Sequence, residues 1–316
     1  MSAATLYSQM FPPKPQWSFD EIPDLSGKVV IVTGGNTGIG KETCRQLLKK
    51  NAKVYLAARS KSKAEDAITD LFNDTGKRAI FLELDLSNLP SVKAAVETYT
   101  KMESQLHVLF NNAGVMAPPI EQVTAQNYDM QFGTNTLAPY LLIRLFWPLL
   151  VATASAAGQP TRVVWTSSSV QYYFKAPMKY NTLKDSKERK KLGPFQLYCQ
   201  SKFGAVMLAY VFARRSEQED EGKVVVTTCD PGNIQSDLQR HATGFATRML
   251  NKAVLHPLPF GAITQLFAGT SPEAASFNGR YLRPWARVGE PHKQSKNVEE
   301  QEKLWQWCED EVKEYL

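Results

Sequence analysis

The sequence predicts a single α/β domain in which a doubly wound parallel sheet carries helices on both of its faces. Short β-branched or apolar runs alternate with longer helical patterns along the chain, which requires right-handed crossover connections. A glycine-rich turn follows the first run, and small or polar residues follow most of the later ones. The 316 residues suffice for one sizeable core. We therefore expect one sheet of about seven strands.

The stretch 28–40 organises the rest of the chain. Residues 29–32 are a continuous β-branched run, typical of a strand buried on both faces, and a helical pattern begins at Lys41. The turn between them is rich in glycine. Glycines let the backbone approach a pyrophosphate, and the helix N-terminus offers unpaired N–H groups, so this turn predicts a nucleotide-phosphate site. An ordinary glycine turn is the alternative, which the flanking strand and helix disfavour.

The second strand, expected at residues 53–58, is followed by Arg59. NAD sites usually place a carboxylate about 20 residues beyond the glycines, where it binds the ribose 2′-hydroxyl. Here Arg59 occupies that place, with Lys61 and Lys63 close behind. A guanidinium can bind a 2′-phosphate bidentately, so the predicted cofactor is NADP(H). A surface arginine without a special role is the alternative.

The remaining elements follow from periodicity and from proline content. Residues 1–25 contain four prolines and predict an extended arm, 26–284 the dinucleotide-binding catalytic domain, and 285–316 a C-terminal tail with a helix at 299–315. Residues 172–194 have no clean period and are interpreted as an exposed insertion, with the basic run 184–191 solvated. Further strands are expected at 79–84, 106–110, 162–166 and 224–229, and helices at 64–74, 92–102, 128–150 and 195–215.

Composition excludes several classes of protein. The net charge is +6, but Lys and Arg are scattered, which argues against nucleic-acid binding. Four cysteines without a CxxC spacing or a histidine cluster argue against a metal site and a disulfide framework, and indicate a reducing compartment. The sequence contains neither a transmembrane-length apolar run nor a secretion signal, so we expect no transmembrane segment and a cytoplasmic location.

Several motifs occur together in a recognisable order. They are residues 33–40, residues 111–114 (Asn-Asn-Ala-Gly), Asn135, Ser168, Tyr198 with Lys202 four positions later, and Pro231-Gly232. In order and spacing they resemble the short-chain dehydrogenase/reductase family over roughly residues 28–282, and within it the retinol-dehydrogenase-like group and its fungal relatives. The resemblance implies a Rossmann-type fold and an NADP(H)-dependent enzyme that interconverts an alcohol and its carbonyl.

The resemblance also implies a role for each motif. Tyr198 would be the general acid/base, with its pKa lowered by Lys202 and a cationic nicotinamide. Ser168 would hold the substrate oxygen, although spacing alone does not choose among the three serines at 167–169. Asn135 would hold a water that links Lys202 to solvent. The implied cofactor contacts are Gly34, Asn36, Thr37, Gly38, Ile39, Gly40, Arg59, Lys63, Asp85, Leu86, Asn112, Ala113, Gly114, Tyr198, Lys202, Pro231, Gly232, Ile234 and Ser236.

The substrate is predicted from residues 238–267, where this family builds a lid. Apolar residues there, such as Phe245, Met249 and Phe260, suggest an apolar or aromatic small-molecule alcohol or carbonyl, and core packing against the sheet edge is an equal alternative. Reduction of an activated C=C bond and a non-catalytic NADP-binding scaffold stay open as other functions. The chain is expected to be a monomer, or a homodimer formed through the helices at 128–150 and 195–215.

Overall fold

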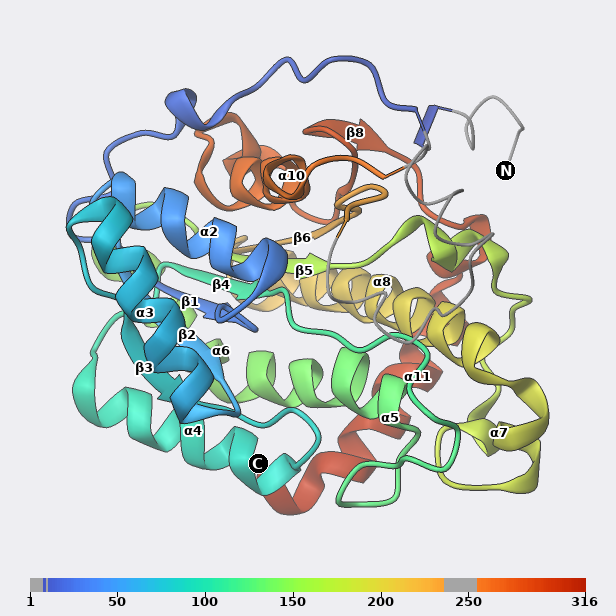
Figure 1. Cartoon of the computed structure of the whole chain (residues 1–316). Coiled ribbons are helices and arrows are strands. Elements are labelled where there is room, and N and C mark those ends of the chain that lie inside the picture. The colour runs from blue at the N-terminus through green and yellow to red at the C-terminus, as the bar shows by residue number, and fades with distance from the viewer. Residues whose placement is uncertain (1–7, 10, 236–254) are drawn as a thin grey trace.

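A mixed sheet forms the centre of the computed structural model, which describes residues 8, 9, 11–235 and 255–316 (Figure 1). The 8 strands have the order β3-β2-β1-β4-β5-β6-β7-β8. All neighbouring pairs are parallel except β7 and β8. The strands are β1 (Val29–Thr33), β2 (Lys53–Ala58), β3 (Ile80–Glu83), β4 (Val108–Asn111), β5 (Thr161–Thr166), β6 (Val224–Cys229), β7 (Tyr281–Arg283) and β8 (Arg287–Gly289).

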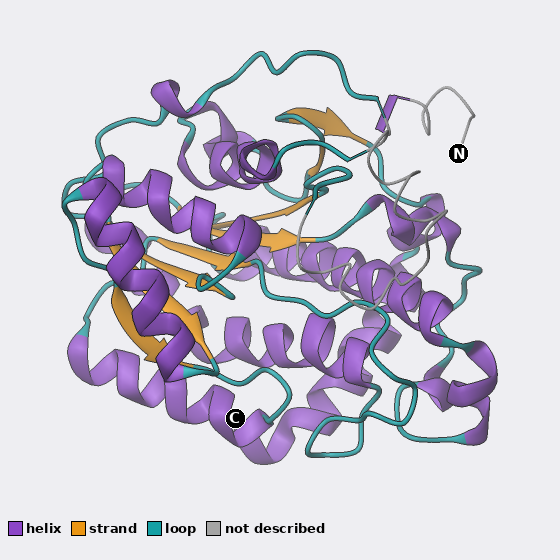
Figure 2. Ribbon diagram, in the orientation of Figure 1, coloured by secondary structure: helices purple, strands orange, loops and turns teal. Residues whose placement is uncertain are grey.

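Helices cover both faces of the sheet, and each side has its own apolar core (Figure 2). One side holds α2 (Gly38–Lys49), α3 (Lys61–Thr75) and α10 (Leu258–Thr270). The other holds α4 (Leu89–Met102), α6 (Ala138–Ala157) and α8 (Pro194–Glu219). The short elements are η1 (Phe19–Glu21), α5 (Met130–Phe132), η2 (Gly133–Leu137), η3 (Ser169–Tyr173), η4 (Tyr180–Thr182), α7 (Lys187–Leu192), η6 (Glu273–Ser276) and η7 (Lys293–Lys296); the C-terminal elements are α11 (Val298–Val312) and η8 (Lys313–Tyr315).

The predicted fold class is confirmed, with one correction to the number of strands. The β-branched interior of β1 is completely buried because it lies between β2 and β4, as its continuous apolar run predicts. About seven strands were expected and six were given residue ranges, whereas the sheet has 8, so neither β7 nor β8 was placed. Each of these two strands has 3 residues, and so short a segment carries no readable alternation.

The predicted helix at 128–150 contains a change of helical type. One turn at Gly133–Leu137 is π-helical, and α6 continues from it to Ala157 with Pro148 inside. Within the described residues, Met130–Ala157 is the helical stretch that is long and apolar enough to cross a membrane. However, 61% of its most apolar window is buried inside the domain, as in the core helix of a soluble protein.

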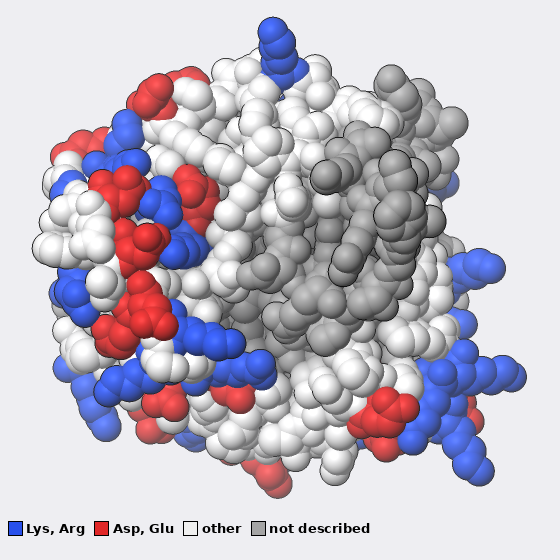
Figure 3. Space-filling view, viewed as in Figure 1, with Lys and Arg blue, Asp and Glu red and all other residues white. Residues whose placement is uncertain are grey.

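The basic segment near α7 is partly buried, which corrects the prediction of an exposed insertion. Figure 3 shows a gathering of Lys and Arg at the lower right, where α7 lies in Figure 1. Arg189, however, is only 1% exposed. Its guanidinium donates hydrogen bonds to Asp129 at 3.2 Å, to Asp185 at 2.9 Å and to the Ile120 carbonyl. An arginine can be buried when its donors are satisfied in this way, and periodicity cannot reveal such distant partners.

The N-terminal arm lies along the α10 side of the sheet (Figure 1). Trp17, Ile22 and Leu25 are buried in that core, and the Trp17 ring packs edge-on against Phe267 at 5.6 Å. Phe267 itself belongs to the core. At this residue, the last of the predicted lid, the side chain therefore packs in the core, which was the alternative to a substrate lid. The lid positions 236–254, with Phe245 and Met249, lie outside the described residues.

The helix of the C-terminal tail, α11, packs against α8. Trp305 meets Tyr140 of α6 and Phe212 of α8 at 5.0 and 4.8 Å between ring centroids. Glu309 accepts hydrogen bonds from Arg144 at 2.7 and 3.1 Å and from the Tyr140 hydroxyl. Therefore α11 covers the face of α6 and α8 through which the expected homodimer would form. The oligomeric state stays a prediction.

The buried arginine provides a test of this packing. Replacing it in the variant Arg189→Ala should lower the free energy of unfolding by about 3–5 kcal/mol, because Asp129 would keep a buried charge without its partner. Urea unfolding measures this. The matched control is Lys187→Ala on the exposed face of α7, with an expected change within about 0.5 kcal/mol. Equal stability of the two variants would contradict the account.

Candidate active site

A cleft of about 820 Å³ lies at the carboxyl ends of the parallel strands. Open α/β sheets bind ligands at this edge. The site lies between the neighbouring strands β1 and β4, because successive strands are added outward from β1 on one side and outward from β4 on the other. Asn135 does not line the cleft, and Ser236 lies outside the described residues. The other predicted site residues all line it: Gly34, Asn36, Thr37, Gly38, Ile39, Gly40, Arg59, Lys63, Asp85, Leu86, Asn112, Ala113, Gly114, Ser168, Tyr198, Lys202, Pro231, Gly232 and Ile234.

The glycine turn between β1 and α2 leaves no room for a side chain at Gly40. A Cβ at Gly40 would lie 2.3 Å from the Gly34 carbonyl oxygen and 2.5 Å from the Asn112 amide nitrogen. Gly34 and Gly38 have φ values of +67° and +55°, which glycine adopts without strain. The first turn of α2 contains no acidic residue, so its N-terminus keeps a positive potential toward the cleft. These features fit a bound pyrophosphate.

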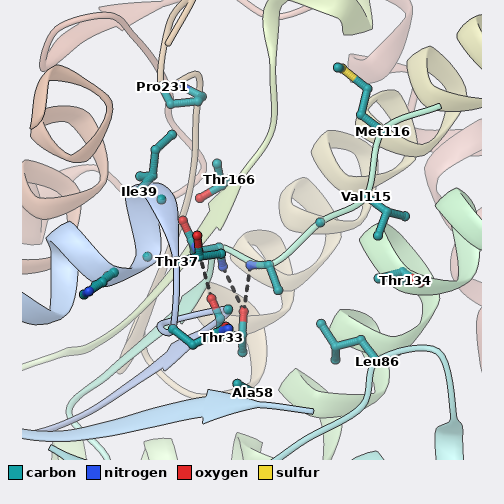
Figure 4. A pocket seen from close by; sticks show the side chains of 18 of the residues that line it. Thr33, Thr37, Ile39, Ala58, Leu86, Val115, Met116, Thr134, Thr166 and Pro231 are labelled. Atoms are coloured by element: carbon teal, nitrogen blue, oxygen red, sulfur yellow. Dashed lines mark hydrogen bonds between the residues drawn. The ribbon is translucent and has the colours of Figure 1, made fainter. Parts of the chain in front are cut away.

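Thr33 joins the ends of β1 and β4 beneath this turn (Figure 4). Its hydroxyl donates to the Phe110 carbonyl at 3.2 Å and accepts from the backbone N–H groups of Asn112 and Ala113, both at 3.0 Å. The Asn112 side chain donates to the Thr33 carbonyl at 2.8 Å. The two strand ends are thereby fixed at the floor of the cleft. The sequence analysis gave Thr33 no separate role, because its partners lie 77 to 80 residues away.

The far end of the cleft contains the basic side chains of Arg59 and Lys63 together with Asp85. Arg59 follows β2, is exposed, and forms no hydrogen bond or ion pair with a described residue. Lys63 lies in the first turn of α3, which Ser60 caps. Asp85 is held in place because its carboxylate accepts hydrogen bonds from the Ser87 backbone and hydroxyl at 2.9 and 2.7 Å. The unpaired guanidinium fits an additional phosphate at this end.

Tyr198 and Lys202 project into the other end of the cleft from α8. They are four positions apart, so they share a helix face, and both are buried. The Lys202 ammonium lies 5.9 Å from the centre of the Tyr198 ring and donates to the Thr166 carbonyl at 2.8 Å. A Cβ at Gly114 would lie 3.5 Å from that ammonium, so the strand end passes close to it.

Burial changes the proton affinities of both groups. It lowers the pKa of Lys202 to about 8 and raises the pKa of Tyr198 above its usual value of about 10. The negative charge of Asp230 raises the Tyr198 pKa further, and a hydrogen bond with the Ser168 hydroxyl opposes the rise. Lys202 was expected to lower the Tyr198 pKa together with a cationic nicotinamide. In the protein alone, burial and the charge of Asp230 raise the Tyr198 pKa instead.

All three serines that follow β5 line the cleft, and their contacts distinguish Ser167 from Ser168. The Ser167 hydroxyl is buried and donates to the Lys202 carbonyl at 3.1 Å, so it has a structural contact. The Ser168 hydroxyl lines the cleft beside Tyr198 and accepts from the Val170 backbone N–H at 3.3 Å. Of these two hydroxyls, that of Ser168 is placed to meet a substrate oxygen.

Asn135 lies behind the cleft, within the π-helical turn. Its side chain accepts from the Val115 N–H at 2.8 Å and donates to the Val115 carbonyl and the Ser201 hydroxyl, both at 3.0 Å. The backbone carbonyl of Asn135 accepts a hydrogen bond from the Trp165 indole N–H at 3.2 Å. Asn135 therefore fixes the backbone beside Gly114 and the helix that carries Lys202. Its proposed contact with a water stays a prediction. Single π turns are frequent at functional sites.

Further residues of the cleft received no role in the sequence analysis. Among them are Met116 and Val115, which Figure 4 shows on the side of the cleft opposite the predicted cofactor contacts Ile39 and Pro231. Asp230, directly after β6, is buried behind the catalytic end. The sequence signal that could have identified Asp230 is the position of an acidic residue between a buried strand and Pro231. Among the described residues, His, Cys, Asp and Glu form no group of three or more that could hold a metal ion.

Comparison with known proteins agrees with this geometry. The model of the short chain dehydrogenase family matches residues 28–184. A short-chain dehydrogenase/reductase of Armillaria gallica is 49% identical over 314 residues, which cover 99% of each chain.

Solved structures show the same fold at lower identity. A putative uncharacterized protein from Mycobacterium paratuberculosis superposes with a TM-score of 0.70 at 24% identity, covering 94% of this chain and 97% of that one. The NADP active-site complex of Pseudomonas aeruginosa RhlG has a TM-score of 0.64 at 24% identity, with 83% and 95% covered. The family prediction is thus confirmed, while the retinol-dehydrogenase-like subgroup stays a prediction. The chain belongs to the short-chain dehydrogenase/reductase family of oxidoreductases.

Proposed function

We propose that this protein is an NADP(H)-dependent oxidoreductase that interconverts an alcohol and its carbonyl compound. One observation carries the proposal: a single cleft has Ser168, Tyr198 and Lys202 at one end and, at the other, Arg59, which has no hydrogen bond or ion pair with a described residue. Open α/β sheets bind dinucleotides across this switch point. NADP in the active-site complex of the related fold of Pseudomonas aeruginosa RhlG supports the same cofactor.

The binding residues divide according to the parts of the cofactor. Backbone N–H groups at the start of α2 would hold the pyrophosphate, with Gly34 and Gly40 allowing its close approach. Arg59 and Lys63 would hold the 2′-phosphate. Pro231 and Gly232 would border the nicotinamide. When bound, NADPH supplies the hydride for reduction, and NADP⁺ accepts it in oxidation.

The proton chemistry belongs to the side chains of this protein. Because burial raises its pKa, Tyr198 keeps its phenol proton at neutral pH and can donate it to a carbonyl oxygen. Ser168 would donate a hydrogen bond to the same oxygen as negative charge develops there. Lys202 is charged below its pKa of about 8, and its positive charge would stabilise the phenolate that remains after the proton is transferred. The protonated phenol favours reduction.

The described walls of the cleft favour an apolar part of the substrate. Val115, Met116, Met130 and Val170 contribute apolar surface near Ser168 and Tyr198. Methionine adapts its shape, so these residues can accept substrates of different outline. We therefore propose an aromatic or aliphatic carbonyl compound rather than a sugar or a charged metabolite.

The proposed role of Arg59 is tested by the variant Arg59→Asp. Its affinity for NADPH should fall about 10- to 100-fold, because a charge-assisted hydrogen bond to the 2′-phosphate is replaced by repulsion, while NADH binding is kept. Fluorescence titration with each cofactor measures both constants. The control Lys101→Asp makes the same charge change at the end of α4. NADPH affinity that falls equally in both variants would contradict a specific site.

The proposed acid/base role is tested by the variant Tyr198→Phe. Its turnover of an aromatic aldehyde with NADPH should fall at least about 100-fold, because the proton donor is lost, while the dissociation constant of NADPH changes little. Tyr210→Phe, three turns further along α8, serves as the control and should keep full activity. Substantial turnover in Tyr198→Phe would refute the assignment.

A further inference from the structure

Gln265 is a buried amide in the middle of α10 and does not line the cleft. It is 1% exposed, in a helix whose other buried residues are mostly apolar. Transfer of an amide into such surroundings is unfavourable unless its hydrogen bonds to water are replaced. Both polar atoms of the Gln265 side chain have partners, and these partners lie on three different segments around the cleft. The amide therefore joins these three segments.

The three partners belong to α2, to the end of β4 and to the end of β5. The Gln265 Nε2 donates to the Thr43 hydroxyl and, at 3.4 Å, to the Asn112 side-chain oxygen. Its Oε1 accepts from the Thr166 hydroxyl at 2.8 Å. The Thr43 hydroxyl donates its own proton to the Ile39 carbonyl at 2.8 Å, so it accepts from Gln265. This direction fixes the orientation of the amide.

Two of the partners continue into the predicted pyrophosphate site. The Ile39 carbonyl, which Thr43 holds, belongs to the first turn of α2, where backbone N–H groups would bind the phosphates. The Asn112 side chain also donates to the Thr33 carbonyl at 2.8 Å. A Cβ at Gly40 would lie 2.5 Å from the Asn112 nitrogen, so this side chain packs directly against the glycine turn. Gln265 thus lies behind both walls of the turn.

Two glycines let α10 approach these segments closely. A Cβ at Gly261 would lie 2.8 Å from the Ile39 side chain, and a Cβ at Gly269 would lie 2.2 Å from the Phe110 ring. Gly261, Gln265 and Gly269 are four positions apart, so they share one face of α10. The helix lies beside α2 and packs against β4 and β5 as well (Figure 1). The close approach lets a single side-chain amide reach all three segments.

We propose that Gln265 is a positioning residue of the cofactor site: it holds α2, β4 and β5 together so that the glycine turn keeps the shape that a pyrophosphate requires. This inference rests on the proposed function, since it takes this turn as the pyrophosphate site. Gln265 acts through Thr43 and Asn112. A site that already has its binding geometry loses less free energy to ordering when the ligand arrives, so it binds more tightly.

The effect of Gln265 should be confined to the cofactor. Its third partner, Thr166, is also held by strand pairing, since β5 lies between β4 and β6 and the Ser167 N–H donates to the Cys229 carbonyl at 2.7 Å. The Thr166 carbonyl, which accepts from Lys202, should therefore stay in place without Gln265. Loss of the amide thus predicts weaker cofactor binding with an unchanged turnover number at saturating cofactor.

The variant Gln265→Met keeps the length of the side chain and removes its hydrogen bonds. The dissociation constants of NADPH and NADH should both rise about 3- to 10-fold, as expected for the loss of about one hydrogen bond's stabilisation. Their ratio should stay that of the parent, because both cofactors contain the pyrophosphate, whereas Arg59→Asp should change the ratio. Fluorescence titration well below the melting temperature of each variant measures these constants. The KM for NADPH should rise equally, with kcat for an aromatic aldehyde unchanged.

Adenosine 2′-monophosphate provides an internal control. It carries the phosphate proposed for Arg59 but no pyrophosphate. Its dissociation constant, measured by calorimetry, should therefore be equal in the parent and in Gln265→Met.

The matched control variant is Gln301→Met in α11, far along the chain from the glycine turn. Gln301 is 2% exposed, donates to the Ser295 carbonyl at 2.7 Å and accepts from Arg214 at 2.7 Å. Its replacement also removes a buried, hydrogen-bonded amide and should lower the melting temperature. It should leave the dissociation constants of NADPH, NADH and adenosine 2′-monophosphate unchanged.

Thr43 provides the same measurement if Gln265→Met does not fold. Thr43→Val removes the hydroxyl with little change of shape and should weaken the binding of both cofactors by a similar factor, while Thr43→Ser should restore the affinity of the parent. In the double variant Gln265→Met/Thr43→Val, the loss of affinity should be smaller than the product of the two single losses, because both changes break the same network.

The outcomes separate this inference from the proposed function. Cofactor affinities in Gln265→Met that equal those of the parent, or that fall no further than in Gln301→Met, would overturn the inference and leave the proposed reaction intact. A parallel loss of NADPH and NADH affinity in Gln265→Met, in a protein that reduces no carbonyl, would support the role of Gln265 while refuting the proposed reaction. A parent protein that binds neither cofactor would overturn both.

Discussion

The ammonium group of Lys202 is buried where the ends of β1, β4, β5 and β6 converge, and the site depends on keeping it there. Burial of a charge is unfavourable, which the lowering of the Lys202 pKa to about 8 expresses directly. The Thr166 carbonyl accepts one of its hydrogen bonds, and the absence of a side chain at Gly114 leaves space beside it. The packing of the rest of the domain has to offset this penalty.

The helix that carries Lys202 is held on several sides. Ser201, the neighbouring residue, accepts a hydrogen bond from Asn135 in the π-helical turn, and the Ser201 carbonyl accepts one from Thr136. Further along α8, Phe212 packs against Trp305 of α11. The same turn fixes Val115, next to the strand end that borders the ammonium. Asn135 thereby acts on both walls around Lys202, although it does not line the cleft. A rigid α8 keeps Tyr198 and Lys202 in one fixed relation.

Local patterns explain how much could be predicted from the sequence. The β-branched runs of β1 and β6 and the glycines before α2 are local signals, and the structure places strands and a turn there. The Tyr198 and Lys202 spacing places both on one face of α8, as helix geometry requires. Arg189 could not be predicted as buried, because its partner Asp129 lies 60 residues away. The contacts of Thr33 likewise depend on a distant segment.

The central claim is that the cleft transfers a hydride between NADP(H) and a carbonyl carbon, with the proton supplied by the protein. The most direct measurement uses NADPH that carries deuterium at the reactive nicotinamide carbon, with aromatic ketones and α,β-unsaturated ketones as substrates, and mass spectrometry of the products. The account predicts deuterium on the former carbonyl carbon of an alcohol. Deuterium on a carbon of a reduced C=C bond with the carbonyl intact, or no transfer to any acceptor by a protein that binds NADPH, would contradict it.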